Sequence, residues 1–167
     1  MPESVAIVTG ASQGIGRATA VRLAKDFSAV VLAARSAEAL KEVAAAVKST
    51  GAEPLAIALD LSRTINAAII ALAKAFAEQG IKDGIQVNSV VPGPVMTGRR
   101  QSFMEKWALA HCITVEEATK KFPEDAGISR YGRPEEIADL MAFLVSPAAK
   151  WLTGTSVRMD GGEIKGI

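Results

Sequence analysis

The chain has 167 residues, a formal net charge of +1 and 49% hydrophobic residues, which suits one globular domain (1–167) with a sizeable core. The balanced charge gives no reason to expect a nucleic-acid or anionic-membrane partner. The sequence starts without a basic, apolar leader and holds no apolar run long enough to span a bilayer, so we expect a cytoplasmic protein. Cys112 is the single cysteine and His111 the single histidine, so neither a disulfide nor a metal site is expected.

The most informative stretch lies near the N-terminus. An apolar strand, Val5–Thr9, runs into the sequence Thr-Gly-Ala-Ser-Gln-Gly-Ile-Gly (Thr9–Gly16), and a helical pattern follows over Arg17–Lys25. Strand, glycine-rich turn and helix together place backbone N–H groups and a helix N-terminus against a pyrophosphate. Three glycines permit, in chain order, the tight turn, the backbone approach to phosphate and the close packing of helix on strand: Gly10, Gly14 and Gly16.

Two further strands follow with a helix between them. Ala29–Ala34 is a continuous apolar run of the kind found in parallel sheets. Ser36 is placed to cap a helix that Gly51 ends. Pro54–Leu59 is predicted as the third strand, with Asp60 directly after it.

The second half continues the alternation. Ala67–Ala77 is a helix that is apolar nearly all round, which predicts burial on more than one side and a contact between subunits. The long connection Gly98–Arg133 is predicted to hold two short helical pieces, the second opened by a capping box from Thr114 to Glu117. The remaining predicted elements are a strand Ile85–Val91, a rigid turn Pro92–Pro94, a helix Pro134–Val145 and a strand Thr155–Met159. This order indicates an α/β fold with a mostly parallel sheet.

Four segments together resemble the short-chain dehydrogenase/reductase family. They lie in the family's order over nearly the whole chain: Thr9–Gly16, Asp60-Leu61, Val87–Thr97, and Gly132–Ala138 followed by Leu152–Gly154 and Asp160–Gly162. The resemblance implies a Rossmann-like, doubly wound parallel sheet. It also implies hydride transfer between a nicotinamide cofactor and a carbonyl or alcohol, by a homodimer or homotetramer. The alternative is a dinucleotide-binding or regulatory protein that has lost the chemistry.

The resemblance also assigns cofactor-binding roles to named positions. The residues assigned to the pyrophosphate and the adenosine ribose are Gly10, Ser12, Gln13, Gly14, Ile15 and Gly16. Asp60 and Leu61 are placed at the adenine. The residues assigned to either side of the nicotinamide carboxamide are Pro92, Gly93, Val95 and Thr97.

The end of the second strand bears on the choice of cofactor. An acidic residue there binds the ribose 2′-hydroxyl and repels a 2′-phosphate. This chain has Ala34 at that position, followed by Arg35 and Ser36, and a guanidinium suits a phosphate. We therefore expect NADP(H) to be favoured over NAD(H), although Gln13 stands where many NADP-preferring relatives carry a basic residue.

The catalytic residues of the family have no counterpart here. The family uses a serine on one strand and a Tyr-x-x-x-Lys motif at the start of the next helix. In the register of Ala67–Ala77, the lysine position falls on Asn66 and the tyrosine position on Ser62. The single tyrosine, Tyr131, lies far along the chain, and the family's Asn-Asn-Ala-Gly segment is missing.

The gap in the pattern falls near residues 62–64. Roughly 60 to 90 residues, including the fourth and fifth strands at the middle of the sheet, are missing there, at about 30 residues per βαβ unit. Their loss would expose two parallel strands that are apolar on both faces, or force a new pairing. Our hypothesis is that this sequence omits a segment of the real polypeptide; an engineered deletion is the other interpretation.

The connection 98–133 resembles the mobile lid that covers the nicotinamide in this family. Phe103, Met104 and Trp107 fit either a substrate-facing lid or a surface helix packed on the domain. Arg99 and Arg100 fit an anionic ligand, although a solvated pair is the simpler interpretation.

Overall fold

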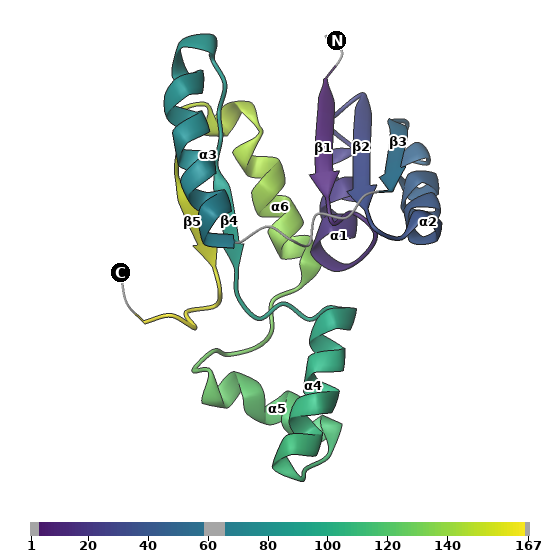
Figure 1. The fold of residues 1–167 in the computed structure, drawn as a ribbon, viewed down its shortest axis with the longest axis vertical. Coiled ribbons are helices and arrows are strands. Elements are labelled where there is room, and N and C mark those ends of the chain that lie inside the picture. The colour runs from purple at the N-terminus through teal and green to yellow at the C-terminus, as the bar shows by residue number, and fades with distance from the viewer. Residues whose placement is uncertain (1–3, 59–65, 166–167) are drawn as a thin grey trace.

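The computed structural model describes residues 4–58 and 66–165 and has an α/β architecture (Figure 1). In chain order the elements are β1 (Val5–Thr9), α1 (Gly14–Leu23), β2 (Ala29–Ala34), α2 (Ala37–Lys48), β3 (Glu53–Ala58), α3 (Asn66–Gly80), the 3₁₀ turn η1 (Ile81–Asp83), β4 (Ser89–Pro92), α4 (Gly98–His111), α5 (Val115–Asp125), α6 (Pro134–Leu144), the 3₁₀ turn η2 (Pro147–Ala149) and β5 (Ser156–Met159).

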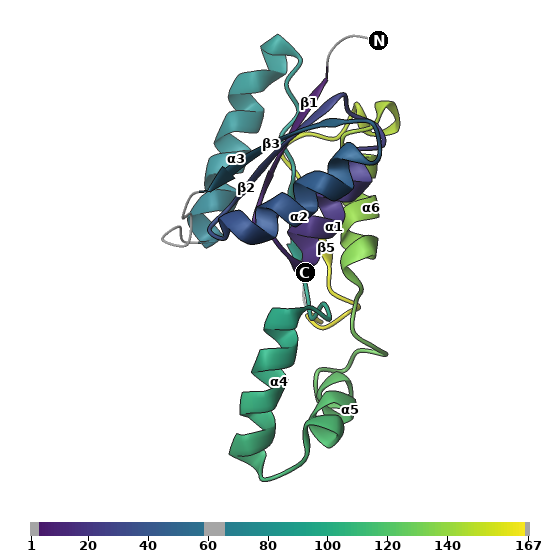
Figure 2. The same ribbon diagram turned by 90° about the vertical axis from the view of Figure 1, so that its right-hand side faces the viewer.

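The first half is a three-stranded parallel sheet in the order β1-β2-β3, as the apolar runs predict. Helices α1 and α2 cover one of its faces, and the core lies between them and the strands (Figure 2). Ser36 caps α2 as expected, because its Oγ accepts a hydrogen bond from the Ala39 N–H at 3.3 Å. The largest fully buried side chains of this core are Val30, Leu32, Leu40, Val43 and Val47.

The second half contains a separate two-stranded parallel sheet, β4-β5. The prediction of a strand over Ile85–Val91 is wrong for its first part, since β4 begins at Ser89. The amide side chains of Gln86 and Asn88 donate to the carbonyl oxygen of Leu152 at 2.9 and 2.8 Å. These side-chain bonds attach the segment to the chain before β5, together with a backbone bond from the Gly154 N–H to the Val87 carbonyl oxygen at 2.7 Å.

The two sheets do not pair with each other in the described residues, so the parallel sheet is divided in two. Ile7 of β1 is 71% exposed and lines the space between the two sheets. The halves are joined by α6, which packs on α1: the Thr19 hydroxyl donates to Met141 Sδ at 3.2 Å, and Arg22 pairs with Asp139 at 3.1 Å. In Figure 2, α3 stands on the other side of the sheets from α1, α2 and α6.

Helices α4 and α5 form a hairpin beyond the end of the sheets (Figure 1). The prediction of short helical pieces is wrong for α4, which has 14 residues. The capping box of α5 is confirmed: the Glu117 N–H donates to Thr114 Oγ1 at 3.2 Å, and the Thr114 N–H donates to Glu117 Oε2 at 2.8 Å. Within the described ranges, no helix has both the length and the apolar character needed to cross a membrane.

Candidate functional site

The turn between β1 and α1 requires glycine at three positions. Gly10 and Gly14 have φ angles of +66° and +54°, in the left-handed region that side chains disfavour. Gly16 has a different reason, because a Cβ there would lie 2.2 Å from the carbonyl oxygen of Gly10. The glycine-rich turn is therefore folded back onto the first turn of α1.

The N-terminus of α1 is suited to an anion. Its cap residue, Gln13, makes no side-chain capping hydrogen bond, and the first turn carries no acidic residue. The N–H groups of a first helical turn have no intrahelical acceptor and lie at the positive end of the helix dipole. The turn is also fixed to the end of β2, since the Ala11 N–H donates to the Ala33 carbonyl at 3.2 Å. A phosphate is the ligand that this arrangement favours.

Two predicted segments that are far apart in the sequence meet at this turn. A Cβ on Gly14 would lie 3.0 Å from Cγ2 of Thr97, so the glycine-rich turn touches the N-cap residue of α4. Thr97 is held there as the cap of α4, because its Oγ1 accepts a hydrogen bond from the Arg100 N–H at 3.3 Å.

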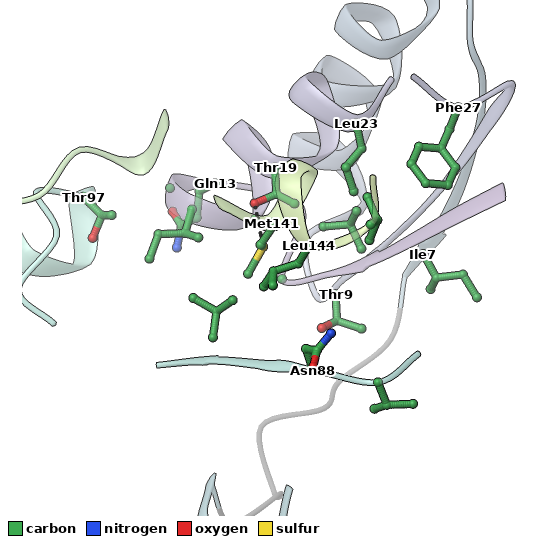
Figure 3. A pocket seen from close by; sticks show the side chains of 18 of the residues that line it. Ile7, Thr9, Gln13, Thr19, Leu23, Phe27, Asn88, Thr97, Met141 and Leu144 are labelled. Atoms are coloured by element: carbon green, nitrogen blue, oxygen red, sulfur yellow. Dashed lines mark hydrogen bonds between the residues drawn. The ribbon is translucent and has the colours of Figure 1, made fainter. Parts of the chain in front are cut away.

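A cavity of about 950 Å³ opens between the two half-sheets at this contact (Figure 3). Its volume is at the upper end for small-molecule and cofactor sites. The predicted site residues that line it are Gly10, Gln13, Gly14, Ile15, Gly16 and Thr97. Among the further lining residues, Thr9 and Asn88 belong to the family segments Thr9–Gly16 and Val87–Thr97, although neither was predicted as a site residue. No local motif marks the others, Thr19, Gln86, Met141, Leu144 and Val145, which come from α1, α6 and the chain beside them.

Arg99 is the one charged residue among the described residues that line this cavity. The basic pair is divided, since the Arg100 guanidinium instead lies 5.2 and 5.0 Å from the ring centroids of Phe103 and Phe122. The described lining therefore favours an anionic ligand. It includes no Tyr, Lys, His, Cys or carboxylate, so it binds charge but offers no group that exchanges a proton near neutral pH.

Several predicted site residues lie outside this cavity. Arg35 is exposed at the end of β2, and Ser36 beside it caps α2. Pro92 ends β4, and Gly93 and Val95 line a second cavity of about 240 Å³. Asp60 and Leu61, together with Ser62 and the proposed break at 62–64, fall outside the described residues.

The second cavity includes a strongly perturbed carboxyl group. The Arg130 guanidinium, 2.6 Å from Glu136 Oε1, and the Arg133 N–H, 2.8 Å from Oε2, lower the pKa of Glu136 from 4.5 to about 2. Glu136 thereby ties the chain before α6 to the first turn of that helix. A carboxyl group held ionised in this way is suited to structure more than to proton transfer.

Tyr131, in the connection between α5 and α6, packs on an aromatic cluster of the α4–α5 hairpin. Its ring stacks on Phe122 with centroids 5.9 Å apart, and its hydroxyl donates to Met104 Sδ at 3.2 Å. Burial raises the pKa of the Tyr131 hydroxyl. Phe103 and Trp107 also meet Phe122 edge to face. These side chains pack on one another and do not line the large cavity.

His111 and Cys112 have local roles at the end of α4. His111 stacks on Trp107 with ring centroids 4.0 Å apart, and the exposed Cys112 has a left-handed conformation, φ 54°, at the helix C-cap. The described residues contain no group of three or more His, Cys, Asp and Glu side chains placed to hold a metal ion.

Comparison with known families gives two matches that meet near residue 65. Residues 4–66 match the model of the short chain dehydrogenase family, and residues 63–163 match a model described as Enoyl-(Acyl carrier protein) reductase. The second match alone covers more than half of the chain.

Among curated proteins, the chain is similar to the uncharacterized oxidoreductase YvrD of Bacillus subtilis, with 33% identity over 153 residues. That alignment covers 89% of this chain and 56% of YvrD. The NADPH-dependent reductase BacG of the same species is 34% identical over 103 residues, which cover 62% of this chain and 40% of BacG. The chain thus spans about half the length of the curated relatives it matches.

Solved structures share the fold. L-sorbose reductase from Gluconobacter frateurii, complexed with NADPH and L-sorbose, matches with a TM-score of 0.87 at 20% identity. The alignment covers 98% of this chain and 97% of that one.

Proposed function

The chain belongs to the short-chain dehydrogenase/reductase family, and on this basis we propose that it is an NAD(P)-dependent oxidoreductase acting on a small carbonyl or alcohol. The observation that carries the proposal is the contact of Gly14 with Thr97 beside the uncapped N-terminus of α1. It joins the phosphate-binding and nicotinamide-side motifs at one cavity. When bound, the nicotinamide supplies or accepts the hydride.

The proposed cofactor roles are those that the family resemblance implies, and the residues lining the large cavity support part of them. The turn from Gly10 to Gly16 and the first N–H groups of α1 hold the pyrophosphate, and Arg99 adds positive charge to the same cavity. We propose that Thr97 contacts the nicotinamide carboxamide together with Pro92, Gly93 and Val95. The family resemblance assigns Asp60 and Leu61 to the adenine.

NADP(H) is the proposed cofactor. Arg35 is exposed at the end of β2, beside the Ala33 carbonyl that anchors the glycine-rich turn. Its guanidinium and the Ser36 hydroxyl suit a ribose 2′-phosphate, and the residue at the end of β2 is Ala34 instead of an acidic residue. BacG is named as NADPH-dependent, and the L-sorbose reductase structure contains NADPH.

The proton-transfer group is proposed to come from a segment that this sequence lacks. The described cavity lining has no acid or base, and Asn66, at the lysine position, begins α3. The two family matches overlap at residues 63–66, beside the proposed break. Intact-mass measurement of the protein from its source tests this: a mass well above 17.4 kDa is expected, and a mass of 17.4 kDa would refute the missing segment.

A dinucleotide-binding protein without catalysis is the second candidate, favoured by the same absence of acid and base groups in the described lining. Fluorescence titration with NADPH, followed by an assay against a panel of carbonyl compounds, separates the two. Binding with turnover supports the oxidoreductase. Binding without turnover in a chain of 17.4 kDa supports the binding protein, and absence of NADPH binding contradicts both.

The proposal includes a homodimer or homotetramer that uses α3, a cytoplasmic location, and a covering role for the α4–α5 hairpin. Leu72 and Phe76 of α3 are 56% and 54% exposed, which supports a contact with another subunit. Thr97, the N-cap residue of α4, touches the glycine-rich turn, so the hairpin is attached at the edge of the cavity that it would cover.

A further inference from the structure

Arg99 brings a positive charge to the large cavity. The residue is exposed and lines the cavity, and none of the ion pairs formed between the described residues includes it. The described lining also holds no carboxylate, so no negative charge there offsets the guanidinium. A cleft whose charge has one sign concentrates ligands of the opposite sign. The cavity therefore attracts an anion to the neighbourhood of Arg99.

The first turn of α4 gives its two arginines different surroundings. Thr97 caps this turn, because its Oγ1 accepts a hydrogen bond from the Arg100 N–H at 3.3 Å. The Arg100 guanidinium lies 5.2 and 5.0 Å from the ring centroids of Phe103 and Phe122, and these contacts hold it in the hairpin. Arg99 is the one of the pair that is available to a ligand in the cavity.

The proposed cofactor has phosphate-binding groups elsewhere. The pyrophosphate is assigned to the turn from Gly10 to Gly16 and the N-terminus of α1, and the ribose 2′-phosphate is assigned to Arg35 at the end of β2. Neither assignment needs Arg99, which follows Thr97 by two residues on α4. Thr97 is proposed to contact the nicotinamide carboxamide, at the end of the cofactor where the substrate reacts. A positive charge at this place therefore suits the substrate.

Arg99 is also part of the hairpin that we propose as a cover for the cavity. Thr97 touches Gly14 at the start of this hairpin, and Figure 3 shows Thr97 and Gln13 near the same end of the cavity. A covering element closes after its ligands have entered, so a charged side chain on it can contact the ligand that it encloses. A guanidinium binds a carboxylate or phosphate through two parallel N–H···O bonds, which also orient the ligand.

We propose that Arg99 binds an anionic group of the substrate, and that the substrate is a small carbonyl compound, or the corresponding alcohol, that carries a carboxylate or a phosphate. The inference rests on the proposed function and narrows its substrate class. Arg99 binds and orients the substrate and takes no part in the transfer of hydride or proton. Neutral carbonyl compounds of similar shape lack the group that it binds, so they are expected to bind weakly.

Pairs of ligands that differ mainly in charge test the inference. The protein is the full polypeptide, at the length that intact-mass measurement establishes, saturated with NADP⁺ so that no carbonyl is reduced. Calorimetric titration compares acetoacetate with acetoacetamide for a carboxylate, and dihydroxyacetone phosphate with dihydroxyacetone for a phosphate. The anionic member of at least one pair should bind about 30-fold more tightly than its neutral partner, as expected for one charge-assisted hydrogen bond.

Variants of α4 connect this preference to Arg99. Arg99→Gln should abolish the preference for the anionic ligand, and Arg99→Lys should keep part of it, because lysine retains the charge but not the planar fork. Lys106→Gln is the matched control, since Lys106 is an exposed cation of α4 outside the cavity lining, and this variant should keep the full preference. All three variants should bind NADP⁺ as tightly as the wild type does.

The possible results separate this inference from the proposed function. Equal affinity for the two members of both pairs overturns the inference, and so does a preference that Arg99→Gln retains. A loss of NADP⁺ affinity in Arg99→Gln, with the preference unchanged, would assign Arg99 to a cofactor phosphate instead. Titration with NADP⁺ alone comes first, because a wild type that does not bind it refutes the proposed function and this inference together.

Discussion

The two half-sheets differ in how far each is stabilised by contacts between residues close in sequence. The β1-β2-β3 half has its glycine-rich turn, its covering helices and a continuous core, and its parts are close in sequence. The β4-β5 half is a pair of four-residue strands that depends on contacts reaching across the chain, such as Gln86 with Leu152. In our proposal the first half binds phosphate with its own residues, whereas the second contributes Thr97 and Arg99 to the lining of the same cavity. The site therefore depends on a joint between two unequal halves.

Disruption of the first half itself should have the largest effect. In Gly16→Ala, the new Cβ would lie 2.2 Å from the Gly10 carbonyl oxygen, and the glycine-rich turn must move. We expect NADPH binding to become unmeasurable and the free energy of unfolding to fall by about 3 kcal/mol, the upper end for overpacking. Fluorescence titration and urea denaturation measure the two effects.

Gly98→Ala is the control for that variant. Gly98 begins α4, and a Cβ there meets nothing within 4 Å. NADPH affinity should stay the same, and equal losses in both variants would contradict the role of the turn.

A smaller loss is expected from a change that leaves the fold of the first half intact. Arg35→Ala removes a charge-assisted hydrogen bond to the 2′-phosphate, which is worth about 2 kcal/mol, or about 30-fold in the Kd of NADPH. The Kd of NADH should not change. Lys41→Ala removes an exposed positive charge from α2 and serves as the control. A preference for NADH that Arg35→Ala leaves unchanged would exclude the proposed role.

The packing of α6 on α1, which joins the two halves, is tested by introducing a larger side chain into it. Ala142 of α6 is 5% exposed and belongs to the core that contains Ala20 and Leu23 of α1. Ala142→Leu should lower the free energy of unfolding by about 1–2 kcal/mol through overpacking. NADPH should also bind more weakly, because Thr97 moves away from Gly14.

Phe143→Leu changes a neighbouring side chain that is 46% exposed, and it should affect neither quantity. If Ala142→Leu lowers stability without weakening NADPH binding, the two halves do not need their observed arrangement to form the site.

The smallest effect is expected in acid. Glu136 has a pKa of about 2 in the folded chain against 4.5 without its partners. The folded state therefore stabilises the ionised carboxylate relative to the unfolded state. This contribution to stability is present above pH 4.5 and is lost as the pH falls from 4.5 towards 2. Thermal unfolding should show a midpoint that decreases over this interval. In Glu136→Gln that decrease should be smaller, and an unchanged pH profile would contradict the ion pair's contribution.

Sequence patterns predicted the features that depend on near neighbours. The strands Val5–Thr9 and Ala29–Ala34, the Ser36 cap and the Thr114 capping box are confirmed, because each depends on residues within a few positions. The glycine-rich turn is confirmed in its conformation for the same reason. Its role in binding a cofactor stays a prediction.

Features that depend on distant partners were not predictable in the same way. The segment before Ser89 has the apolar pattern of a strand, but its amide side chains bond to carbonyls more than 60 residues away. Arg99 and Arg100 are identical and adjacent, and the fold alone decides that one lines the cavity while the other lies between Phe103 and Phe122. Asn88, Met141 and Leu144 reach the cavity only because α6 packs on α1.

The aromatic cluster of the α4–α5 hairpin has a consequence for conformational entropy. Phe122 of α5 contacts Phe103 and Trp107 of α4, so these side chains are already ordered by contacts within the hairpin. A movement of the hairpin as one body therefore changes backbone angles mainly in the two connecting segments, which the Val95–Gly132 bridge holds side by side. Ordering one backbone residue costs about 1–2 kcal/mol, so a preformed hairpin avoids most of that cost on closing. Any closure over the cavity would then be limited by those few connecting residues.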